Sequence, residues 1–389
     1  MTSTLPNKVT RLLIANRGEI ARRVIRTARH MGIQTVAVYS DADRHALHVR
    51  EADTAVALGG TLSADSYLRI DKLLAAAKAT GADAVHPGYG FLSENAEFAQ
   101  AVIDAGLTWV GPPPAAIWAL GSKSAAKALA LQHGVPCLPG YFGADQSDAT
   151  FTAQAQQLGL PLMVKAVAGG GGRGMRLVTD MAQLLPALHS ARSEALAGFG
   201  NGDLLMERAL LRPRHIEVQI MADAHGHCIH LGERDCSVQR RHQKIIEESP
   251  SPAVDAALRA QLGQAAIALA QSAGYVGAGT VEFLLDEAQA DKPFYLMEMN
   301  TRLQVEHPVT EMLTGLDLVE WQLRIARGEA LPLGQADVRL QGHAIEVRLC
   351  AEDEHFTPQT GRVQAFAAPE GLRFDHALHV GAVVTPHYD

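Results

Sequence analysis

Cysteine, aromatic residues and long apolar runs are all scarce in this sequence of 389 residues. The four cysteines are widely spaced and form no Cys-x-x-Cys pair, which argues against a disulfide scaffold or a zinc ribbon and favours a reducing, cytoplasmic compartment. No apolar run approaches the roughly 18 residues of a membrane span, and the first eight residues lack the layout of a signal peptide. We therefore expect neither a membrane protein nor a secreted one.

Basic residues are also outnumbered. The sequence has 34 Lys and Arg against 42 Asp and Glu, a formal net charge of −8, which argues against nucleic acid or an anionic membrane as the main partner. Apolar residues at 47% and charged residues at 20% are ordinary values for globular proteins, and the length allows two or three domains. The composition therefore predicts a globular chain of several domains.

Residues 1–114 alternate strand and helix signals. Short apolar runs suited to buried strands occur at 12–15, 34–39, 82–86 and 108–110. Helix formers occupy 19–30 and 94–105, the second with Ser93 as the expected cap. This rhythm predicts an N-terminal domain with a doubly wound parallel sheet, so the fold class is α/β.

The rest of the chain is divided by proline- and glycine-rich breaks. We expect a helical linker at 115–137, a small subdomain at 138–210, a larger subdomain at 211–332 and the incomplete start of a further domain at 333–389. Alternating strands at 216–221, 228–231, 280–285 and 294–299 predict an antiparallel sheet, with helices at 252–273 and 316–326, hence a C-terminal α+β domain.

A glycine run, Gly169 to Gly172 followed by Arg173, comes directly after an expected strand that ends near Lys165. Consecutive glycines expose backbone N–H groups to phosphate oxygens, and the P-loop pattern is absent. We interpret the run as a phosphate contact; the alternative is a flexible loop with no ligand.

Three oxygen-bearing side chains lie in two adjacent apolar runs. Glu298 and Asn300 are two apart on one expected strand and so share a face, and a hairpin would place Glu282 beside them. Carboxylate and amide oxygens suit a hard cation such as Mg²⁺. The alternative is that each acid pairs with a base such as Arg302.

The residues that follow, Arg302, Gln304 and Glu306, would line one face if the chain stayed extended. An arginine matches a small planar oxyanion, and a carboxylate beside it could take its proton. An Arg302–Glu306 ion pair is an equal alternative. The charged run 233–244 could likewise be a solvated face or part of an anion site, whereas a dinucleotide site at 15–19 is rejected because its glycine fingerprint is missing.

Taken together, these stretches resemble the biotin carboxylase module of the ATP-grasp superfamily. The similarity runs from about residue 10 to the last residue and is carried by IANRGEIA (14–21), HPGYGFLSEN (86–95), KAVAGGGGRGM (165–175), ERDCSVQRRHQK (233–244), EMNTRLQVEHPVTE (298–311) and GHAIEVRLCAED (342–353). It implies that 138–210 is a mobile ATP-grasp lid and that ATP lies between this lid and the C-terminal ATP-grasp subdomain.

The resemblance also implies roles for individual residues. ATP contacts fall on Lys123, Lys165, Gly171, Gly172, Glu207, Arg208, Ala209, Leu210, His215, Gln239, His242 and Glu282. Magnesium or manganese ligands fall on Glu282, Glu298 and Asn300. The bicarbonate and biotin site falls on Lys244, Arg302, Gln304, Val305 and Arg348, with Glu306 as the general base.

The implied reaction has two stages. Glu306 deprotonates bicarbonate, which attacks the γ-phosphate of ATP to give carboxyphosphate, and biotin held on a carrier is then carboxylated beside Arg348. The implied partners are a biotin carboxyl carrier domain, the carboxyltransferase subunit of a larger enzyme and a second copy in a homodimer, with neither nucleic acid nor membrane.

Two departures stand out. Arg208 occupies a position where many members have Lys, and members continue beyond Asp389, so we expect a C-terminally truncated module. No Met-Lys-Met biotinylation site is present in these residues, so biotin would arrive on a separate carrier domain. Residues 317–322 resemble the α subunits of 3-methylcrotonyl- or geranyl-CoA carboxylases.

Two alternative functions stay open: another ATP-grasp ligase, such as a carboxylate–amine ligase, and a nucleotide-binding fragment without turnover.

Overall fold

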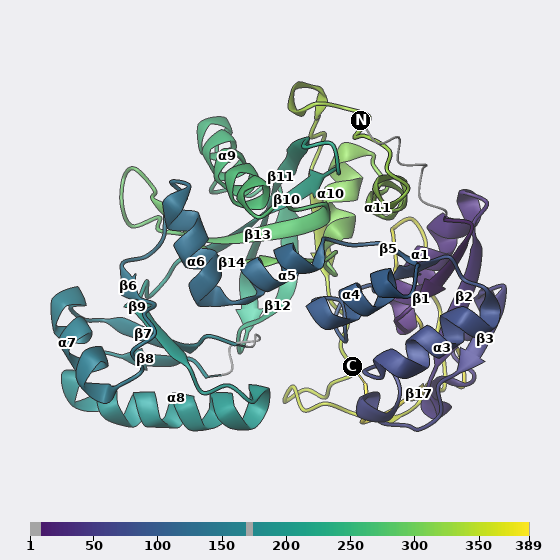
Figure 1. Cartoon of the computed structure of the whole chain (residues 1–389), viewed down its shortest axis with the longest axis horizontal. Helices are drawn as coiled ribbons and strands as arrows, with labels where there is room; N and C mark the ends of the chain where they lie inside the picture. The colour runs from purple at the N-terminus through teal and green to yellow at the C-terminus, as the bar shows by residue number, and fades with distance from the viewer. Residues whose placement is uncertain (1–8, 169–173, 389) are drawn as a thin grey trace.

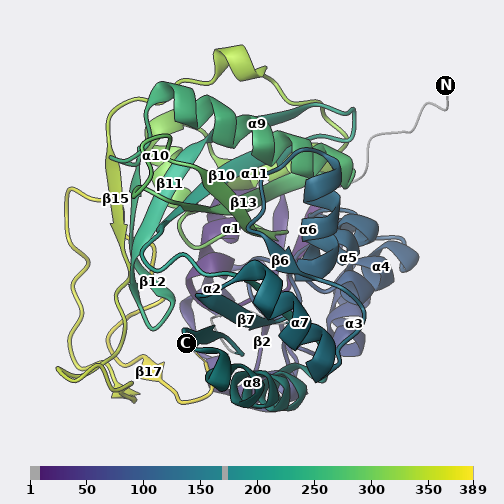
Figure 2. The ribbon, with the colours of Figure 1, turned by 90° about the vertical axis from the view of Figure 1, so that its left-hand side faces the viewer.

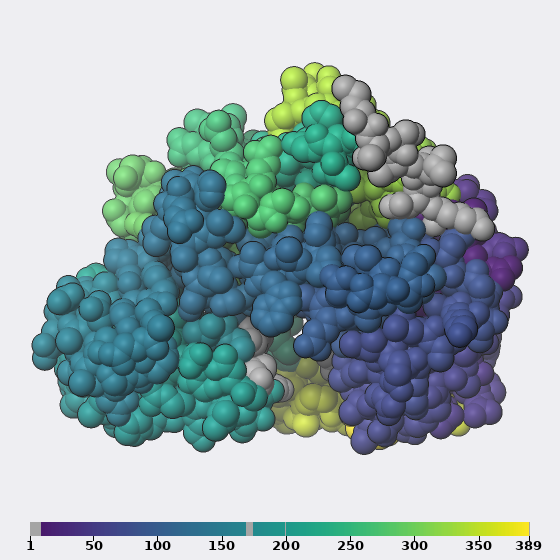
Figure 3. Space-filling model, in the orientation of Figure 1, coloured from purple at the N-terminus to yellow at the C-terminus, as the bar shows by residue number. Residues whose placement is uncertain are grey.

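The computed structural model describes residues 9–168 and 174–388. Figure 1 shows three parts: an N-terminal domain on the right, a central sheet with its helices, and a small lid at the lower left. We call the central part the body. In the space-filling view the surface is hollowed between the lid and the N-terminal domain (Figure 3). The described helices include none that is both long and apolar enough to cross a membrane.

The N-terminal domain is a parallel sheet of five strands in the order β3-β2-β1-β4-β5. Its strands are β1 Arg11–Ile14, β2 Gln34–Tyr39, β3 Thr54–Ala57, β4 Ala84–His86 and β5 Thr108–Trp109. Its helices are α1 Gly18–His30, α2 Leu47–Glu51, α3 Ile70–Thr80 and α4 Ala96–Asp104. The predicted parallel sheet is confirmed.

One local prediction, the cap of α4, was wrong, and the helical linker has more detail than the sequence predicts. The side chain that caps α4 is Asn95, which accepts a hydrogen bond of 2.7 Å from the N–H of Phe98, and not Ser93. The helical linker expected at 115–137 contains two helices, α5 Pro114–Gly121 and α6 Lys123–Gln132. They break at Ser122, whose extended backbone and hydroxyl cap the start of α6.

The lid has its own antiparallel sheet and its own apolar core. The strand order is β6-β9-β7-β8, with β6 Gly140–Tyr141, β7 Leu162–Ala166, β8 Arg176–Val178 and β9 Leu204–Arg208. Helices α7 Asp148–Leu158 and α8 Leu184–Phe199 pack on one side of this sheet. Figure 2 shows the lid from its outer side.

The body is an antiparallel sheet of six strands in the order β14-β13-β10-β11-β12-β15. The strands are β10 Arg214–Ala222, β11 Cys228–Arg240, β12 Gln243–Ser249, β13 Gly277–Leu285, β14 Phe294–Asn300 and β15 Ala344–Val347. The helices are α9 Ala256–Ser272, α10 His307–Thr314 and α11 Leu318–Ala326, and a two-stranded sheet of β16 Gly361–Arg362 and β17 Val383–Val384 follows. Short 3₁₀ turns lie at η1 Asp41–Asp43, η2 Ser63–Asp65, η3 Met181–Gln183 and η4 Gln335–Asp337.

The chain before helix α10 does not stay extended, so the condition on which Arg302, Gln304 and Glu306 would line one face is not met. Strand β14 ends at Asn300, and the chain turns through a short loop into α10, which has Pro308 in its first turn. A proline there is favourable because its missing N–H needs no helical partner. The side chains of this loop are therefore arranged by a turn and not by strand alternation.

The two faces of the body sheet differ in chemistry. On β10, Ile216, Val218 and Ile220 belong to the apolar core that includes α9, and so do Val281 and Phe283 of β13. Because side chains alternate along a strand, the polar residues between them point to the opposite face. That polar face is the side on which the candidate site is built.

Candidate active site

The site begins with two aligned carboxylates on the polar face of the body sheet. Glu217 of β10 lies directly opposite Glu282 of β13, and Glu282 in turn lies opposite Glu298 of β14. The side chains of Glu217 and Glu282 are almost fully buried, at 0% and 4% exposure. Two buried carboxylates this close require cations or hydrogen-bond donors to stabilise them.

Lys244 of β12 is the central cation of this cluster. Its ammonium Nζ lies 2.5 Å from Glu217, 2.8 Å from Glu282 and 2.7 Å from Glu306. Burial alone would lower the pKa of Lys244, but the three carboxylates outweigh burial and hold that pKa well above its ordinary value. Lys244 therefore stays charged and joins the sheet carboxylates to Glu306.

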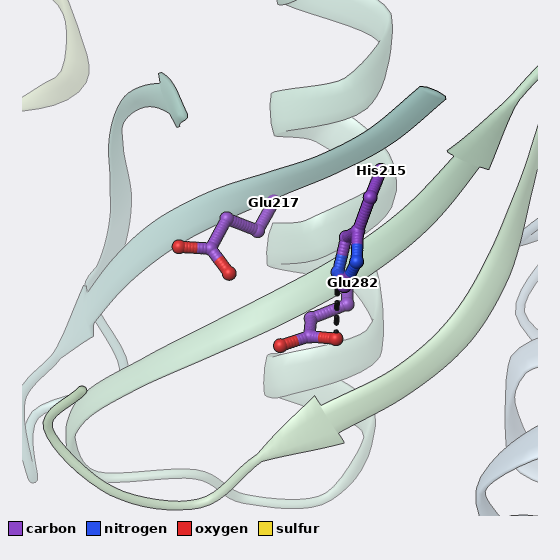
Figure 4. Close-up of side chains that lie close together, drawn as sticks. All are labelled: His215, Glu217 and Glu282. Carbon is purple, nitrogen blue, oxygen red and sulfur yellow. Dashed lines mark hydrogen bonds and ion pairs between the residues drawn. The ribbon is translucent and has the colours of Figure 1, made fainter. Parts of the chain in front are cut away.

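His215 of β10 contacts the carboxylate oxygen of Glu282 that Lys244 does not, and Figure 4 shows His215 and Glu282 together with Glu217. Its Nε2 lies 2.8 Å from a carboxylate oxygen of Glu282, and its Nδ1 lies 2.6 Å from the side-chain amide nitrogen of Gln239. Burial lowers the pKa of His215, but the Glu282 carboxylate outweighs it and raises the pKa above its ordinary value. The predicted nucleotide contacts His215 and Gln239 thus lie beside a predicted metal ligand.

The three predicted metal ligands lie on one hairpin. The side-chain amide of Asn300 donates to Glu282 over 2.8 Å, and the carboxylate of Glu298 lies 3.3 Å from the ammonium of Lys123. All three offer hard oxygen donors on neighbouring strands, which fits Mg²⁺ or Mn²⁺. Lys123, predicted to meet ATP phosphates, also lies next to Glu298.

The loop after β14 carries the predicted bicarbonate residues. Arg302 bonds Glu94 of the N-terminal domain over 2.9 Å, so the proposed Arg302–Glu306 ion pair is not the arrangement observed. The side-chain amide of Gln304 donates to Glu282 over 3.1 Å. Val305 lies half-buried in the turn before α10.

Glu306 lies at the start of α10 and is 2% exposed. One carboxylate oxygen is 2.7 Å from Lys244, and the other is 3.1 Å from Arg348, which also bonds Glu247 over 2.7 Å. Burial alone would raise the pKa of Glu306, but Lys244 and two nearby arginines outweigh it and hold the pKa far below its ordinary value. Glu306 is therefore a carboxylate at neutral pH, able to take a proton once a cation leaves it.

The residues predicted to form a nucleotide hinge, 207–210, lie at the end of lid strand β9. The carboxylate of Glu207 is bonded by Lys165 of β7 and by Lys127 of α6. The guanidinium of Arg208 donates to the backbone oxygen of Leu158 over 2.9 Å and is otherwise exposed. Ala209 and Leu210 follow as half-buried residues.

The remaining predicted ATP contacts are His242 and two glycines of the glycine run. His242 is exposed in the turn that joins β11 to β12. Gly171 and Gly172, predicted phosphate contacts, lie outside the described residues.

Two family models match this chain. Residues 8–117 match "Biotin carboxylase, N-terminal domain", and residues 122–333 match "Carbamoyl-phosphate synthase L chain, ATP binding domain". The biotin carboxylase of Halalkalibacterium halodurans is 52% identical over 382 residues, an alignment that covers 97% of this chain and 84% of that protein. This chain belongs to the biotin carboxylase family.

Other relatives of the biotin carboxylase family agree. The mitochondrial methylcrotonoyl-CoA carboxylase subunit alpha of Dictyostelium discoideum is 50% identical over 386 residues, covering 98% of this chain but 55% of that protein, so the chain spans about half its length. The biotin carboxylase domain dimer of Hydrogenobacter thermophilus 2-oxoglutarate carboxylase, solved with MgADP, ADP and bicarbonate, has a TM-score of 0.94 and 44% identity, covering 98% of this chain and 84% of that one. The predicted family and fold class are confirmed.

Three residues of the site were missed by the sequence analysis. Glu217 is an acid inside an apolar strand, the same signal that identified Glu282, and could have been found in that way. Arg234 was assigned only to a charged run, yet it is fully buried and bonds Glu217, Gln219, Thr280, Gln304 and Thr310. Glu94 has no local signal, since its partner Arg302 is 208 positions away.

Proposed function

We propose that this chain carries out the ATP-dependent carboxylation of biotin by bicarbonate, as the first half-reaction of a biotin-dependent acyl-CoA carboxylase. One observation carries the proposal: the ammonium of Lys244 touches Glu282 of the metal hairpin and Glu306 at the same time. Phosphoryl transfer and proton removal are thus brought to one point of the site.

The chain's own side chains divide the first stage between them. Arg302, Gln304 and the backbone at Val305 orient bicarbonate, and Glu306 takes its proton. A bound anion would draw Lys244 away from Glu306, and losing that cation raises the proton affinity of the carboxylate at the moment a base is needed.

Nucleotide binding belongs to the lid side of the site. Lys123 and Lys165 compensate the phosphate charge, and the backbone of the hinge at 207–210 meets the adenine. Glu282, Glu298 and Asn300 hold a divalent cation, which when bound offsets the charge of the β- and γ-phosphates.

In the second stage the guanidinium of Arg348 stabilises the developing negative charge on the ureido oxygen of biotin. Arg348 is held ready for this by Glu247 and Glu306. Burial lowers its pKa, but Glu306 and Glu247 outweigh burial and raise the pKa above the ordinary value, so the guanidinium stays charged beside biotin.

The wider assembly follows from the same proposal. Biotin would arrive on a biotin carboxyl carrier domain, the carboxyl group would pass to a carboxyltransferase subunit, and the chain would pair as a homodimer. The methylcrotonoyl-CoA carboxylase relatives favour a branched acyl-CoA as the final acceptor. We place the chain in the cytoplasm, in keeping with four cysteines that form no disulfide.

The domain boundaries are part of the proposal. We propose an N-terminal biotin carboxylase domain at 1–114, a linker at 115–137, a lid at 138–210, an ATP-grasp C-terminal subdomain at 211–332, and the start of the biotin carboxylase C-terminal domain at 333–389.

The deciding experiment measures ADP release with and without bicarbonate, and with and without free biotin. Glu306→Gln should lower the bicarbonate-dependent rate by about 10²- to 10⁴-fold, the usual contribution of a general base. Glu97→Gln, an exposed acid on α4, is the matched control and should leave the rate unchanged. An intact rate in Glu306→Gln would overturn the assignment of the base, and ADP release that biotin does not stimulate would favour another ATP-grasp ligase.

A further inference from the structure

A buried group of three charged side chains joins the lid to the body. The carboxylate of Glu207, on lid strand β9, is 1% exposed and receives an ammonium from each side. Lys165 comes from the adjacent lid strand β7, whereas Lys127 comes from helix α6. We call these three side chains the hinge triad.

Helix α6 belongs to the body and not to the lid. Its residues Ala126 and Ala130 pack in the apolar core of the body sheet, and the lid has a separate core. The Lys127 ammonium also lies 3.4 Å from the backbone oxygen of Leu296 on β14 and 5.3 Å from the ring centroid of Phe142 in the lid. Lys127 therefore bridges the two parts at the point where they meet.

The hinge triad has a net charge of +1. Its two ammonium groups share one carboxylate and have no other carboxylate partner in the part of the chain that the structure describes. Burial raises the pKa of Glu207, but the two lysines outweigh burial and lower the pKa below its ordinary value. The carboxylate is therefore charged, and the net charge of the triad is +1. A buried net charge is unfavourable unless an anion approaches it.

We propose that Lys127 is a positioning residue for the adenine nucleotide. By neutralising the Glu207 carboxylate, Lys127 leaves the charge of Lys165 available to the nucleotide phosphates. Without Lys127, the charge of Lys165 would be cancelled by Glu207, and the triad would be neutral. The inference rests on the proposed function, because it assumes that the anion is a nucleotide phosphate. It adds a residue that does not itself touch the nucleotide.

The test compares MgADP with adenosine, which lacks phosphates, on the full 389-residue chain. Lys127→Met should weaken MgADP binding by roughly tenfold or more, because it removes one buried positive charge from the group that faces the phosphates. Adenosine should bind within about twofold of the parent chain, since the adenine contacts are unchanged. The thermal midpoint should not fall, because Met fills the space and a neutral Glu207–Lys165 pair remains.

Two further variants keep the charge argument falsifiable. Lys127→Arg retains the charge and should bind MgADP nearly as the parent does. The double variant Lys127→Met with Glu207→Gln restores a net charge of +1, so it should recover most of the MgADP affinity. If Lys127→Met does not fold, the comparison of the double variant with the parent decides the question.

The outcomes separate the two levels of the argument. Equal losses of MgADP and adenosine affinity in Lys127→Met would mean a merely structural role and would refute the inference. A double variant as weak as the single one would also refute it. A parent chain that does not bind MgADP at all would refute the proposed function itself, together with this inference.

Discussion

Arg234 is the cation whose removal should disturb the site most. It is fully buried on β11 and donates five hydrogen bonds to side chains, including one of 2.5 Å to Glu217 and one of 3.2 Å to Gln304. In Arg234→Met the methionine fills part of the space but supplies no donor. Of the cations that Glu217 contacts among the described residues, Lys244 alone would remain, and Glu217 already shares it with Glu282 and Glu306.

The expected size of the effect follows from this count. Breaking a buried ion pair by removing one partner costs about 3–5 kcal/mol, because the other charge is left without compensation. Divided by the unfolding entropy of a 389-residue chain, this cost should lower the thermal midpoint of Arg234→Met by roughly 5 °C. The bicarbonate-dependent release of ADP should fall as well, since Gln304 and Glu217 lose the group that orients them.

The assay is thermal unfolding of the parent and of two matched variants. Arg240→Met removes an arginine from the same strand, but that guanidinium is only half-buried and pairs with Glu352, so the midpoint should move much less than in Arg234→Met. Adding Glu217→Gln to Arg234→Met removes the stranded carboxylate charge and should recover part of the loss. If Arg234→Met is no less stable than Arg240→Met, the buried network does not stabilise the fold as we argue.

Two other predictions concern pH and metal. Burial, with a contribution from Asp375, raises the pKa of Glu19 from 4.5 to about 8. Because the folded chain then holds a proton that the unfolded chain releases, stability should fall as pH rises from about 4.5 to 8. Glu19→Gln should therefore be more stable than the parent at pH 8, by about 1–2 kcal/mol for this half-buried group, and equally stable at pH 4.5. Thermal unfolding at the two pH values would check this. A gain in stability that is the same at both pH values would contradict the reasoning. Glu298→Gln should raise the Mg²⁺ concentration that gives half-maximal ADP release by at least about tenfold, since even outer-shell groups change metal affinity 10- to 100-fold; an unchanged requirement would remove Glu298 from the metal site.

Much of the site could be predicted from the sequence because the patterns that indicate it involve residues close together in the chain. The hairpin that pairs Glu282 with Glu298 follows from strand alternation and a short connection, and both are properties of neighbouring residues. The parallel sheet of the N-terminal domain follows from the βαβ rhythm in the same way. The start of α10 was not predicted, because the residues before it were considered only as an extended chain. Pro308, in the first turn of α10, is a residue type that indicates the start of a helix.

The sequence by itself determined which residues alternate on a strand, which acids lie in apolar runs and which family the chain resembles. Only the tertiary structure decided which charge meets which: Lys244 among three carboxylates, Arg302 on Glu94, and Lys127 across the hinge from Lys165. The physical reason is that periodicity acts over a few residues, whereas the energy of a buried charge depends on all the groups packed around it. Those groups come from strands and helices that are far apart in the chain, and only folding brings them together.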